Sequence, residues 1–317
     1  MNRLAVADAH VDVLYRMERE GCSFTDPASP LQASADKLQR GGVMAQVFAL
    51  YVSPREPDVF QLETVLRQID LFYEEIVQAG GVAPIRTLDE WIAARRSRNI
   101  AGVLSLEGGG CLRGQPELLR TLYRLGVRGI GLTWNHPNAL ADGCLESRGG
   151  GLTDAGWRVV REAHRLGMWI DIAHLADAGV RELLTHTNGP IMASHANARA
   201  IHGHPRNLPD DVIRELYARG GWMGLVFEAS FVGDPANRTL DQLCRHLDHV
   251  LSLGGEDHVG FGSDFDGTTH PVAGLATAED YASFTERLVQ RYGRPLAEKL
   301  CFRNFESFLY RTLPRHA

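Results

Sequence analysis

Short apolar runs alternate with longer amphipathic segments along almost the whole chain. The runs are rich in Val, Ile and Leu and are bounded by Gly, Pro or polar residues, a pattern typical of buried strands. They predict eight strands, at 4–9, 43–51, 100–106, 127–133, 168–173, 190–194, 221–227 and 258–263. Apolar residues at helical spacing predict helices at 58–79, 87–97, 116–125, 153–166, 177–186, 209–219, 239–253 and 278–292.

Eight alternating strand and helix units predict an α/β fold, a closed parallel (β/α)8 TIM barrel. Such a barrel takes roughly 250 residues. The chain has 317, which leaves room for enlarged strand-to-helix loops and a C-terminal helix but not for a second large domain. We therefore predict a single domain over residues 1–317. Four loops that follow strands would border its pocket, at 21–37, 134–151, 196–208 and 228–238.

Composition narrows the classes of partner. The formal net charge is −6 and no basic run interrupts the chain, so we expect no nucleic acid partner. No apolar stretch approaches the ~20 residues that span a bilayer, so we expect no membrane association. The start MNRLAVADAH lacks a secretory apolar core, and five scattered cysteines indicate neither a disulfide framework nor a zinc-thiolate cluster. A cytoplasmic location is the expectation.

Imidazole and carboxylate side chains stand at the carboxyl ends of the predicted strands, where barrel enzymes place their chemistry. Taken singly, each has an ordinary structural explanation as a turn cap, a loop carboxylate or a core histidine bonded to a carbonyl. Two strand-terminal histidines on neighbouring strands favour a metal site, because imidazole is a common zinc ligand. The candidates are His10, Asp12, Glu107, His174, His195 and Asp264.

The ligand count favours two metal ions. Three histidines and up to three carboxylates exceed what one tetrahedral zinc uses, whereas a binuclear site needs a bridging carboxylate with ligands on both sides. Neither Lys37 nor Lys299 lies at a strand end, which disfavours a modified lysine as the bridge. We therefore predict Glu107 as the bridge. Asp264 closes the last strand and would lie beside His10 when the barrel shuts.

Five ordered motifs, ADAHVDVL, SLEGGG, DIAHLADAG, ASHANARAIHGHPRNLPDD and HVGFGSDFDG, closely resemble the membrane (renal) dipeptidase family of zinc peptidases in the amidohydrolase superfamily. The resemblance extends from residue 8 to about residue 270. It implies that His10 and Asp12 bind one zinc, that His174 and His195 bind the other, and that Glu107 bridges both. A water or hydroxide would lie between the two zinc ions, made nucleophilic at neutral pH.

The resemblance also assigns two residues outside the ligand set. It implies that Asp264 orients the water, takes its proton and passes that proton to the leaving amine. It implies that Arg206, in HPRNLPDD, holds the terminal carboxylate of a dipeptide, which a planar guanidinium binds bidentately. Without the resemblance, a surface ion pair with Asp210 or Asp211 is the preferred reading of Arg206.

One position departs from the family. Animal members carry Leu-Thr-His after the fourth strand, and that histidine stabilises the tetrahedral intermediate, whereas this chain reads Leu132-Thr133-Trp134-Asn135-His136. The indole N–H of Trp134, the amide of Asn135 or the imidazole of His136 would have to supply the donor. The departure bears on the substrate class more than on metal binding.

Three functions remain open at this point. The first is a zinc-dependent dipeptidase for small dipeptides, with tolerance for a D-residue at the C-terminal position and a homodimeric state, both expected from the resemblance alone. The second is a binuclear amidohydrolase that acts on another amide, a lactone or a peptide-like metabolite. A catalytically silent metal-binding barrel ranks last, because all five ligands and Asp264 are present.

Overall fold

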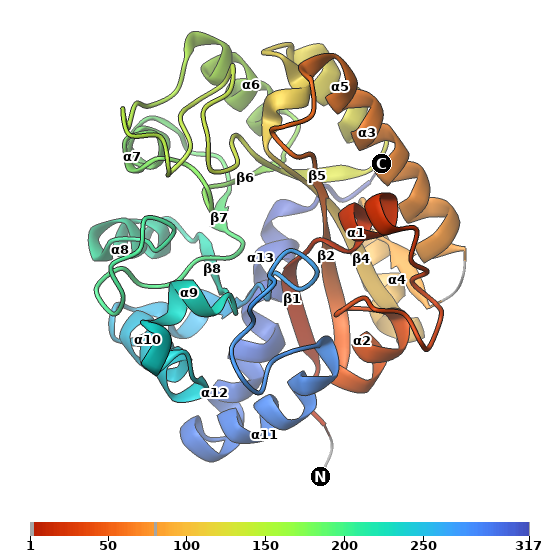
Figure 1. Ribbon diagram of the computed structural model, residues 1–317, viewed down its shortest axis with the longest axis vertical. Coiled ribbons are helices and arrows are strands. Elements are labelled where there is room, and N and C mark those ends of the chain that lie inside the picture. Colours follow the sequence, from red (N-terminus) through yellow and green to blue (C-terminus); the bar gives the residue numbers. More distant parts are fainter. Residues whose placement is uncertain (1–2, 79–80, 317) are drawn as a thin grey trace.

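Figure 1 shows the computed structural model of the chain, in which helices surround a central barrel of strands. The structure describes residues 3–78 and 81–316. Eight parallel strands close the barrel in the order β1, β2, β4, β5, β6, β7, β8 and β9, and β9 pairs again with β1. The predicted fold class, a TIM barrel, is confirmed.

Each predicted strand overlaps an observed one. The first begins two residues later than predicted and therefore runs through His10. The strands of the ring are β1 (Val6–Val11), β2 (Val43–Tyr51), β4 (Ile100–Glu107), β5 (Val127–Gly131), β6 (Trp169–Asp171), β7 (Ile191–Ala193), β8 (Trp222–Leu225) and β9 (Val259–Phe261). A short strand that was not predicted, β3 (Val82–Pro84), pairs with the start of β4 outside the ring.

The helices between the strands follow the predicted pattern. Threonine side chains cap the first turns of three of them, α4, α6 and α10, which fixes where these helices begin. They are α3 (Asp58–Leu71) with a π-helical turn (Phe72–Val77), α4 (Leu88–Ser97), α5 (Pro116–Arg124), α6 (Asp154–Arg165), α7 (Asp177–His186), α8 (Asp210–Ala218), α10 (Leu240–Ser252) and α11 (Tyr281–Tyr292). The predicted end of the first helix, at 79, lies outside the described residues.

Several short elements were not predicted. The helices α1 (Val13–Glu20), α2 (Ala35–Gly41) and α9 (Ala229–Val232) follow strands or lie in predicted loops, and α9 is too short to show a period. Single turns of 3-10 helix occupy Gly109–Leu112, Pro235–Asn237, Gly255–Asp257 and Ala278–Asp280. Among the helices of residues 3–78 and 81–316, none is long and apolar enough to cross a membrane.

The C-terminal segment closes the amino-terminal end of the barrel. It comprises α12 (Arg294–Glu298), a π-helical turn (Lys299–Arg303) and α13 (Asn304–Thr312), as the predicted C-terminal helix requires. Phe305 packs on Trp222 with ring centroids 5.0 Å apart, and Phe308 packs on Trp169 at 6.0 Å. These rings join the small residues inside the barrel in one buried cluster. The candidate metal-binding residues lie at the opposite end, where the strands terminate.

Candidate metal centre

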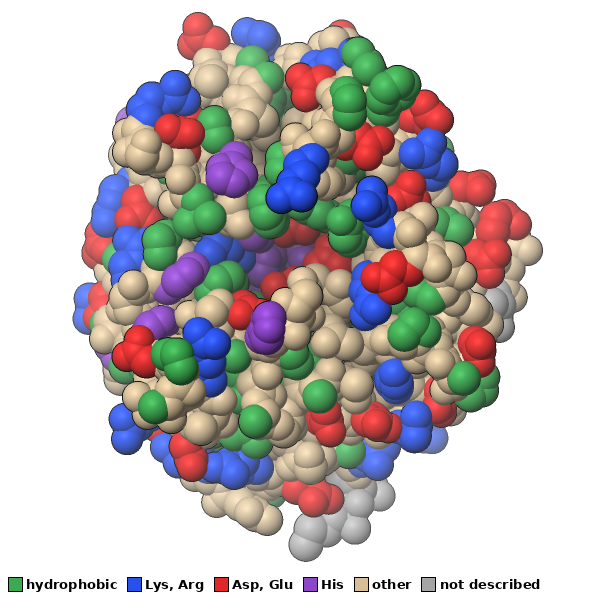
Figure 2. All heavy atoms as spheres, viewed as in Figure 1, with side chains coloured by type: hydrophobic (Ala, Val, Ile, Leu, Met, Phe, Trp, Pro, Cys, Tyr) green, Lys and Arg blue, Asp and Glu red, His purple; other side chains and the backbone are tan. Residues whose placement is uncertain are grey.

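The six candidates predicted at strand ends, from His10 to Asp264, lie together at the carboxyl end of the barrel. Figure 2 shows acidic and histidine side chains gathered in a hollow near the centre of this face. Each side chain comes from the end of a strand or the residues just after it. His10 lies on β1 and Asp12 follows it, Glu107 ends β4, His174 follows β6, His195 follows β7 and Asp264 follows β9.

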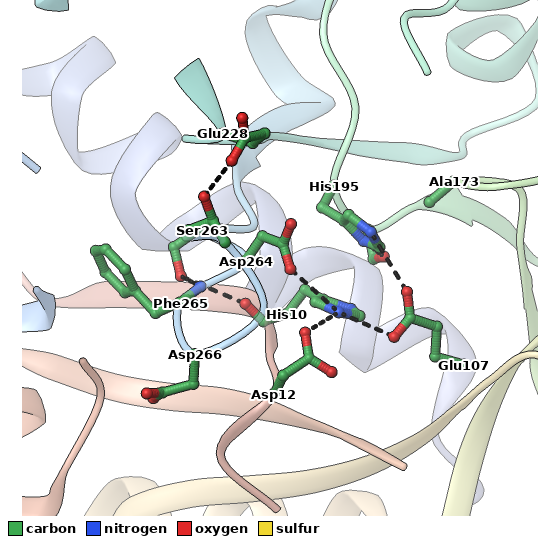
Figure 3. A network of polar contacts seen from close by, with 12 residues as sticks. His10, Asp12, Glu107, Ala173, His195, Glu228, Ser263, Asp264, Phe265 and Asp266 are labelled. Atoms are coloured by element: carbon green, nitrogen blue, oxygen red, sulfur yellow. Dashed lines mark hydrogen bonds and ion pairs between the residues drawn. The ribbon is translucent and has the colours of Figure 1, made fainter. Parts of the chain in front are cut away.

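Glu107 lies between two sets of side chains. Its Oε1 is 2.9 Å from Nε2 of His174 and 3.7 Å from Nε2 of His195. Its Oε2 faces the other way and is 3.6 Å from Nε2 of His10. The same His10 nitrogen is 3.4 Å from Oδ2 of Asp12 (Figure 3). One carboxylate thus faces both sets, as a bridging ligand must.

Hydrogen bonds turn the two histidines of the second set toward each other. Nδ1 of His174 donates to Oδ1 of Asn135 at 2.8 Å, which leaves the lone pair on Nε2. Nδ1 of His195 pairs with Oγ of Ser194 at 2.6 Å. The two Nε2 atoms are 2.9 Å apart beside Glu107. Such second partners orient an imidazole for metal binding.

The donor set fits metal ions. Nε2 of His10 and Oδ1 of Asp12 are buried without a hydrogen-bond partner, which is costly unless a cation occupies the space between them. The possible ligand atoms form three overlapping groups. Within each group, all the atoms lie within 4.8 Å of one another. The groups are His10, Asp12 and Glu107; Glu107, His174 and His195; and His10, His195 and Asp264. Imidazole nitrogen with carboxylate oxygen is a ligand combination that zinc accepts.

Burial and mutual repulsion control the charges of the cluster. Burial by itself lowers the pKa of His10, but the carboxylates of Glu107 and Asp12 raise it well above its usual value. The pKa of Glu107 is lowered, because His10 and His174 outweigh the effect of burial. Burial and the negative charge of Asp12 raise the pKa of Asp264 well above its usual value. The carboxylates therefore lie so close together that protonation is favoured. A bound cation would relieve their mutual repulsion.

The other two imidazoles stay neutral. Burial, and then the charge of Arg206, lowers the pKa of His174 to about 4. Burial, and then His10, lowers the pKa of His195 well below its usual value. Neutral imidazole is the form that binds metal, so both residues are in the ligating state at neutral pH.

Two buried aspartates that sequence reasoning missed hold the ligand-bearing loops. Oδ1 of Asp8 accepts from the backbone N–H of Ser263 at 2.9 Å, and Oδ2 accepts from the Ser263 hydroxyl at 2.6 Å. Oδ1 of Asp171 accepts from the backbone N–H groups of Ala173 and Ser194 at 3.0 and 2.9 Å. These bonds fix the residues beside Asp264, His174 and His195. A carboxylate inside an apolar strand was the signal in the sequence.

The segment after β9 has a special backbone. Asp264 has φ of 65°, and its N–H donates to the carbonyl of His10 at 3.1 Å, which ties the last strand to the first. A side chain on Gly267 would place Cβ 2.1 Å from Oδ2 of Asp12 and 2.4 Å from Oδ1 of Asp264. The last glycine of DFDG therefore leaves the space in which the two carboxylates approach each other.

A cavity of about 340 Å³ opens above the cluster. Aromatic rings form one side of it: Tyr15 contacts Tyr51 with centroids 5.0 Å apart, Tyr51 contacts Trp134 at 5.6 Å, and Trp134 contacts His174 at 5.9 Å. Tyr15 and Tyr51 were not predicted. Tyr51 ends β2, so the rule that selected Glu107 at the end of β4 selects Tyr51 as well.

The opposite side of the cavity is formed by residues after β8 and β9. Glu228, Ser230 and Phe231 come from the predicted loop 228–238, and Thr268 follows the Asp264 turn. None of these residues was predicted individually. A carboxylate at the start of the loop after the seventh strand of the ring was a signal of the same kind as Glu107.

The three residues that could replace the family histidine differ in where the structure places them. Trp134 and Asn135 line the cavity, and the Oδ1 atom of Asn135 is already bonded to His174. His136 is exposed and lines a neighbouring cavity of about 560 Å³, which shares only Glu107 and Trp134 with the first. The indole of Trp134 contacts both His136 and His174, and His136 does not line the cavity above the cluster.

Arg206 is not a surface residue. It is 2 % exposed, and its guanidinium donates to the carbonyl of Ala173 and, at 3.1 Å, to that of His195. The surface pairing is wrong, because Asp210 bonds His249 and Asp211 bonds Arg181 instead. Nε of Arg206 is buried without a partner. The charge is thus fixed beside the two histidine ligands with donor capacity to spare.

The histidines of the predicted loop 196–208 stay outside the cluster. The backbone N–H of His204 donates to the carbonyl of His202 at 2.8 Å, in a turn. The ring of His204 lies 4.5 Å from that of Phe231, and its Nδ1 accepts from the backbone N–H of Arg206. Both histidines therefore take part in the turn and its packing, and neither belongs to the groups that could hold a metal ion.

The chain is similar to dipeptidases both in sequence and in structure. The family described as membrane dipeptidase (peptidase family M19) matches residues 1–308. Dipeptidase verJ of Clonostachys rogersoniana is 34 % identical over 73 % of this chain, and the match spans 60 % of that protein's length. Dipeptidase aclJ of Aspergillus oryzae is 32 % identical over 92 % of this chain and 74 % of its own.

Solved structures agree. A metallopeptidase from Rhodobacter sphaeroides, bound to a phosphinate mimic of L-Ala-D-Ala, superposes with a TM-score of 0.91 at 27 % identity, over 98 % of this chain and 100 % of that one. The crystal structure of a dipeptidase AC of family M19 gives a TM-score of 0.91 at 28 % identity, over 98 % and 99 % of the two chains.

Proposed function

The chain belongs to the membrane dipeptidase family, peptidase family M19, and on that premise we propose that it is a metal-dependent dipeptidase. It would hydrolyse the peptide bond of small dipeptides. The observation that carries the proposal is the position of Glu107, which faces two sets of metal-binding side chains beneath one cavity. A cavity of about 340 Å³ suits a substrate of two residues rather than a long peptide.

We propose that the metal ions are two zinc ions. His10 and Asp12 would hold one, His174 and His195 the other, and Glu107 both. When bound, the ions supply Lewis acidity, which polarises a carbonyl and makes water nucleophilic at neutral pH. The orphaned atoms of His10 and Asp12 support this assignment.

Asp264 is the proposed proton carrier. Its carboxylate is 3.9 Å from Nε2 of His10 and lines the cavity, so it faces both the cluster and the substrate. Burial and Asp12 raise its pKa, which brings a carboxylate toward the range in which it both accepts and returns a proton. It would take the proton of the attacking water and give it to the leaving amine.

Arg206 and the Trp134 region are proposed to bind the substrate. Arg206 holds a positive charge beside the loops that carry the two histidine ligands. It does not itself line the cavity, and its buried Nε, which has no partner, is the donor proposed for the C-terminal carboxylate. Trp134 and Asn135 line the cavity and each carries an N–H donor for the scissile carbonyl. The Rhodobacter sphaeroides protein bound a mimic with a D-residue, and we propose the same tolerance here.

Trp134 also supports a second candidate function. An indole where animal family members carry an imidazole changes the donor offered to the reacting carbonyl, which favours hydrolysis of another amide or a lactone as the alternative. We also propose a cytoplasmic location, on the sequence arguments above, and a homodimer, on the family resemblance alone.

The test is hydrolysis of a library of L,L and L,D dipeptides by zinc-loaded protein, with metal counted on the same sample. We expect turnover that disappears on chelation and about two metal ions per chain, the number the ligand set predicts. Two bound ions without cleavage of any dipeptide would reject the dipeptidase and direct the screen to amides and lactones. One bound ion with full activity would reject the binuclear assignment.

A further inference from the structure

One carboxylate of the cavity lies outside the metal cluster. Four carboxylates line the cavity, those of Asp12, Glu107, Asp264 and Glu228, and no Lys or Arg lines it among the residues that the structure describes. The first three belong to the groups that can hold metal ions, and Glu228 belongs to none of them. Metal ions would therefore compensate the charge of the cluster and leave that of Glu228.

Glu228 is held in place by groups that only donate to it. Its Oε1 accepts from the backbone N–H of Ser230 at 3.0 Å and from the Ser230 hydroxyl at 2.6 Å. Its Oε2 accepts from the hydroxyl of Thr268. Within residues 3–78 and 81–316, no ion pair joins Glu228 to an Arg, Lys or His. The side chain is thus oriented, faces the cavity and has no compensating cation.

The nearby imidazole does not compensate this charge. His204 packs on the ring of Phe231 and is close enough to be affected by Glu228. Burial, and then the charge of Arg206, nevertheless lowers the pKa of His204. The imidazole is therefore neutral at pH 7.

Glu228 lies on the side of the cavity where the C-terminal residue of a dipeptide would be. Phe231 lines the cavity and lies 5.3 Å from the guanidinium of Arg206, the proposed carboxylate site. In Figure 3, Asp264 lies between Glu228 and His10, so Glu228 is set back from the reacting centre. A side chain that leaves the C-terminal residue toward Phe231 would pass Glu228.

We propose that Glu228 determines specificity, selecting dipeptides whose C-terminal residue carries a cationic side chain, such as lysine or ornithine. The inference rests on the proposed dipeptidase function and deepens it. A flexible ammonium side chain donates to a carboxylate that already has two hydroxyl donors, and the partly buried site strengthens that pair. Removing the charge of Glu228 should cost such substrates about tenfold in kcat/KM and cost neutral substrates little.

The experiment compares Glu228→Gln with the wild type, both zinc-loaded and both checked for melting temperature. The substrates are Ala-Lys and Ala-Met, which have C-terminal side chains of similar length, and the reversed pair Lys-Ala and Met-Ala. The glutamine oxygen can accept from Ser230, and its NH2 group can donate to the hydroxyl oxygen of Thr268, so the loop should be preserved. Glu75→Gln controls for the change of net charge, because Glu75 is exposed on a helical turn far from Glu228 in the sequence.

We expect the wild type and Glu75→Gln to prefer Ala-Lys over Ala-Met, and Glu228→Gln to lose that preference through KM. An equal loss on all four dipeptides would overturn the inference, because it would place Glu228 on a group that every dipeptide shares. A preference lost only for Lys-Ala would overturn the assignment to the C-terminal residue. Cleavage of all substrates without any effect of Glu228→Gln refutes the specificity role alone, whereas no cleavage by any protein refutes the dipeptidase itself.

Discussion

Acidification should destabilise the fold through one buried imidazole, that of His246 on α10. Its Nε2 donates to the carbonyl of Val232 at 2.9 Å, and its Nδ1 accepts from the backbone N–H of Ala198 at 3.1 Å. The residue has no exposed surface. Burial lowers its pKa to about 4, and the nearby His202 and His249 act in the same direction. Protonation would remove the acceptor for Ala198 and place a charge in the core.

The sign and size of the effect follow from the two pKa values. Between the ordinary 6.5 and about 4, the unfolded chain binds a proton that the folded chain excludes, so the free energy of unfolding falls as the pH falls. The stabilisation is complete above pH 6.5 and is lost progressively down to pH 4. At about 1.4 kcal/mol per pKa unit, the loss is about 2 kcal/mol at pH 5 and about 3 kcal/mol in full.

The variant that tests this is His246→Gln. A glutamine amide can accept from Ala198 and donate to Val232 but does not titrate. Urea unfolding of the metal-free proteins at pH 7.5 and pH 5 should show the wild type losing about 2 kcal/mol more than the variant. His186→Gln, at an exposed imidazole on α7, should follow the wild type. Equal losses in the wild type and His246→Gln would refute the reasoning.

Three further predictions concern the site. Asp264→Asn should retain bound metal but lose turnover, since the amide keeps the shape and cannot accept the proton; normal rates on dipeptides would contradict the role. Arg206→Ala should raise KM for free dipeptides far more than for C-terminally amidated ones, and equal effects would dismiss the carboxylate contact. Asn135→Ala should weaken metal binding by about 10- to 100-fold, because His174 loses the acceptor that orients its ring, and titration with limiting zinc would measure the loss. Unchanged zinc affinity in that variant would show that His174 is oriented by packing alone.

The periodicity of the sequence was sufficient to predict the architecture of the fold. Eight apolar runs separated by helical segments leave few topologies other than a closed parallel barrel, because consecutive parallel strands need a crossover each. Closure brings the carboxyl ends of all strands to one end of the barrel. Residues at strand ends, such as Glu107 after IAGVLSL and His195 after PIMAS, therefore had to converge, whatever their separation in the chain.

Contacts that depend on side-chain reach across neighbouring loops could not be predicted. The pairing of Asn135 with His174 and the bond from Ser263 to Asp8, 255 positions away, leave no periodic trace in the sequence. His136 has the right chemistry for the missing imidazole, but its ring packs on Trp134 and lines a neighbouring cavity instead of the one above the cluster.

Burial and the choice of partner belonged to the tertiary structure as well. Sequence alone favoured a surface ion pair for Arg206, whereas the fold places it among the carbonyls of the ligand loops. Glu228 was not predicted individually, and only the structure shows that it lies in the wall of the cavity. A pattern of residue types determines which end of a strand a side chain occupies, because strand geometry is local. Which groups then meet it depends on how distant loops pack, and that packing is settled only when the barrel has closed.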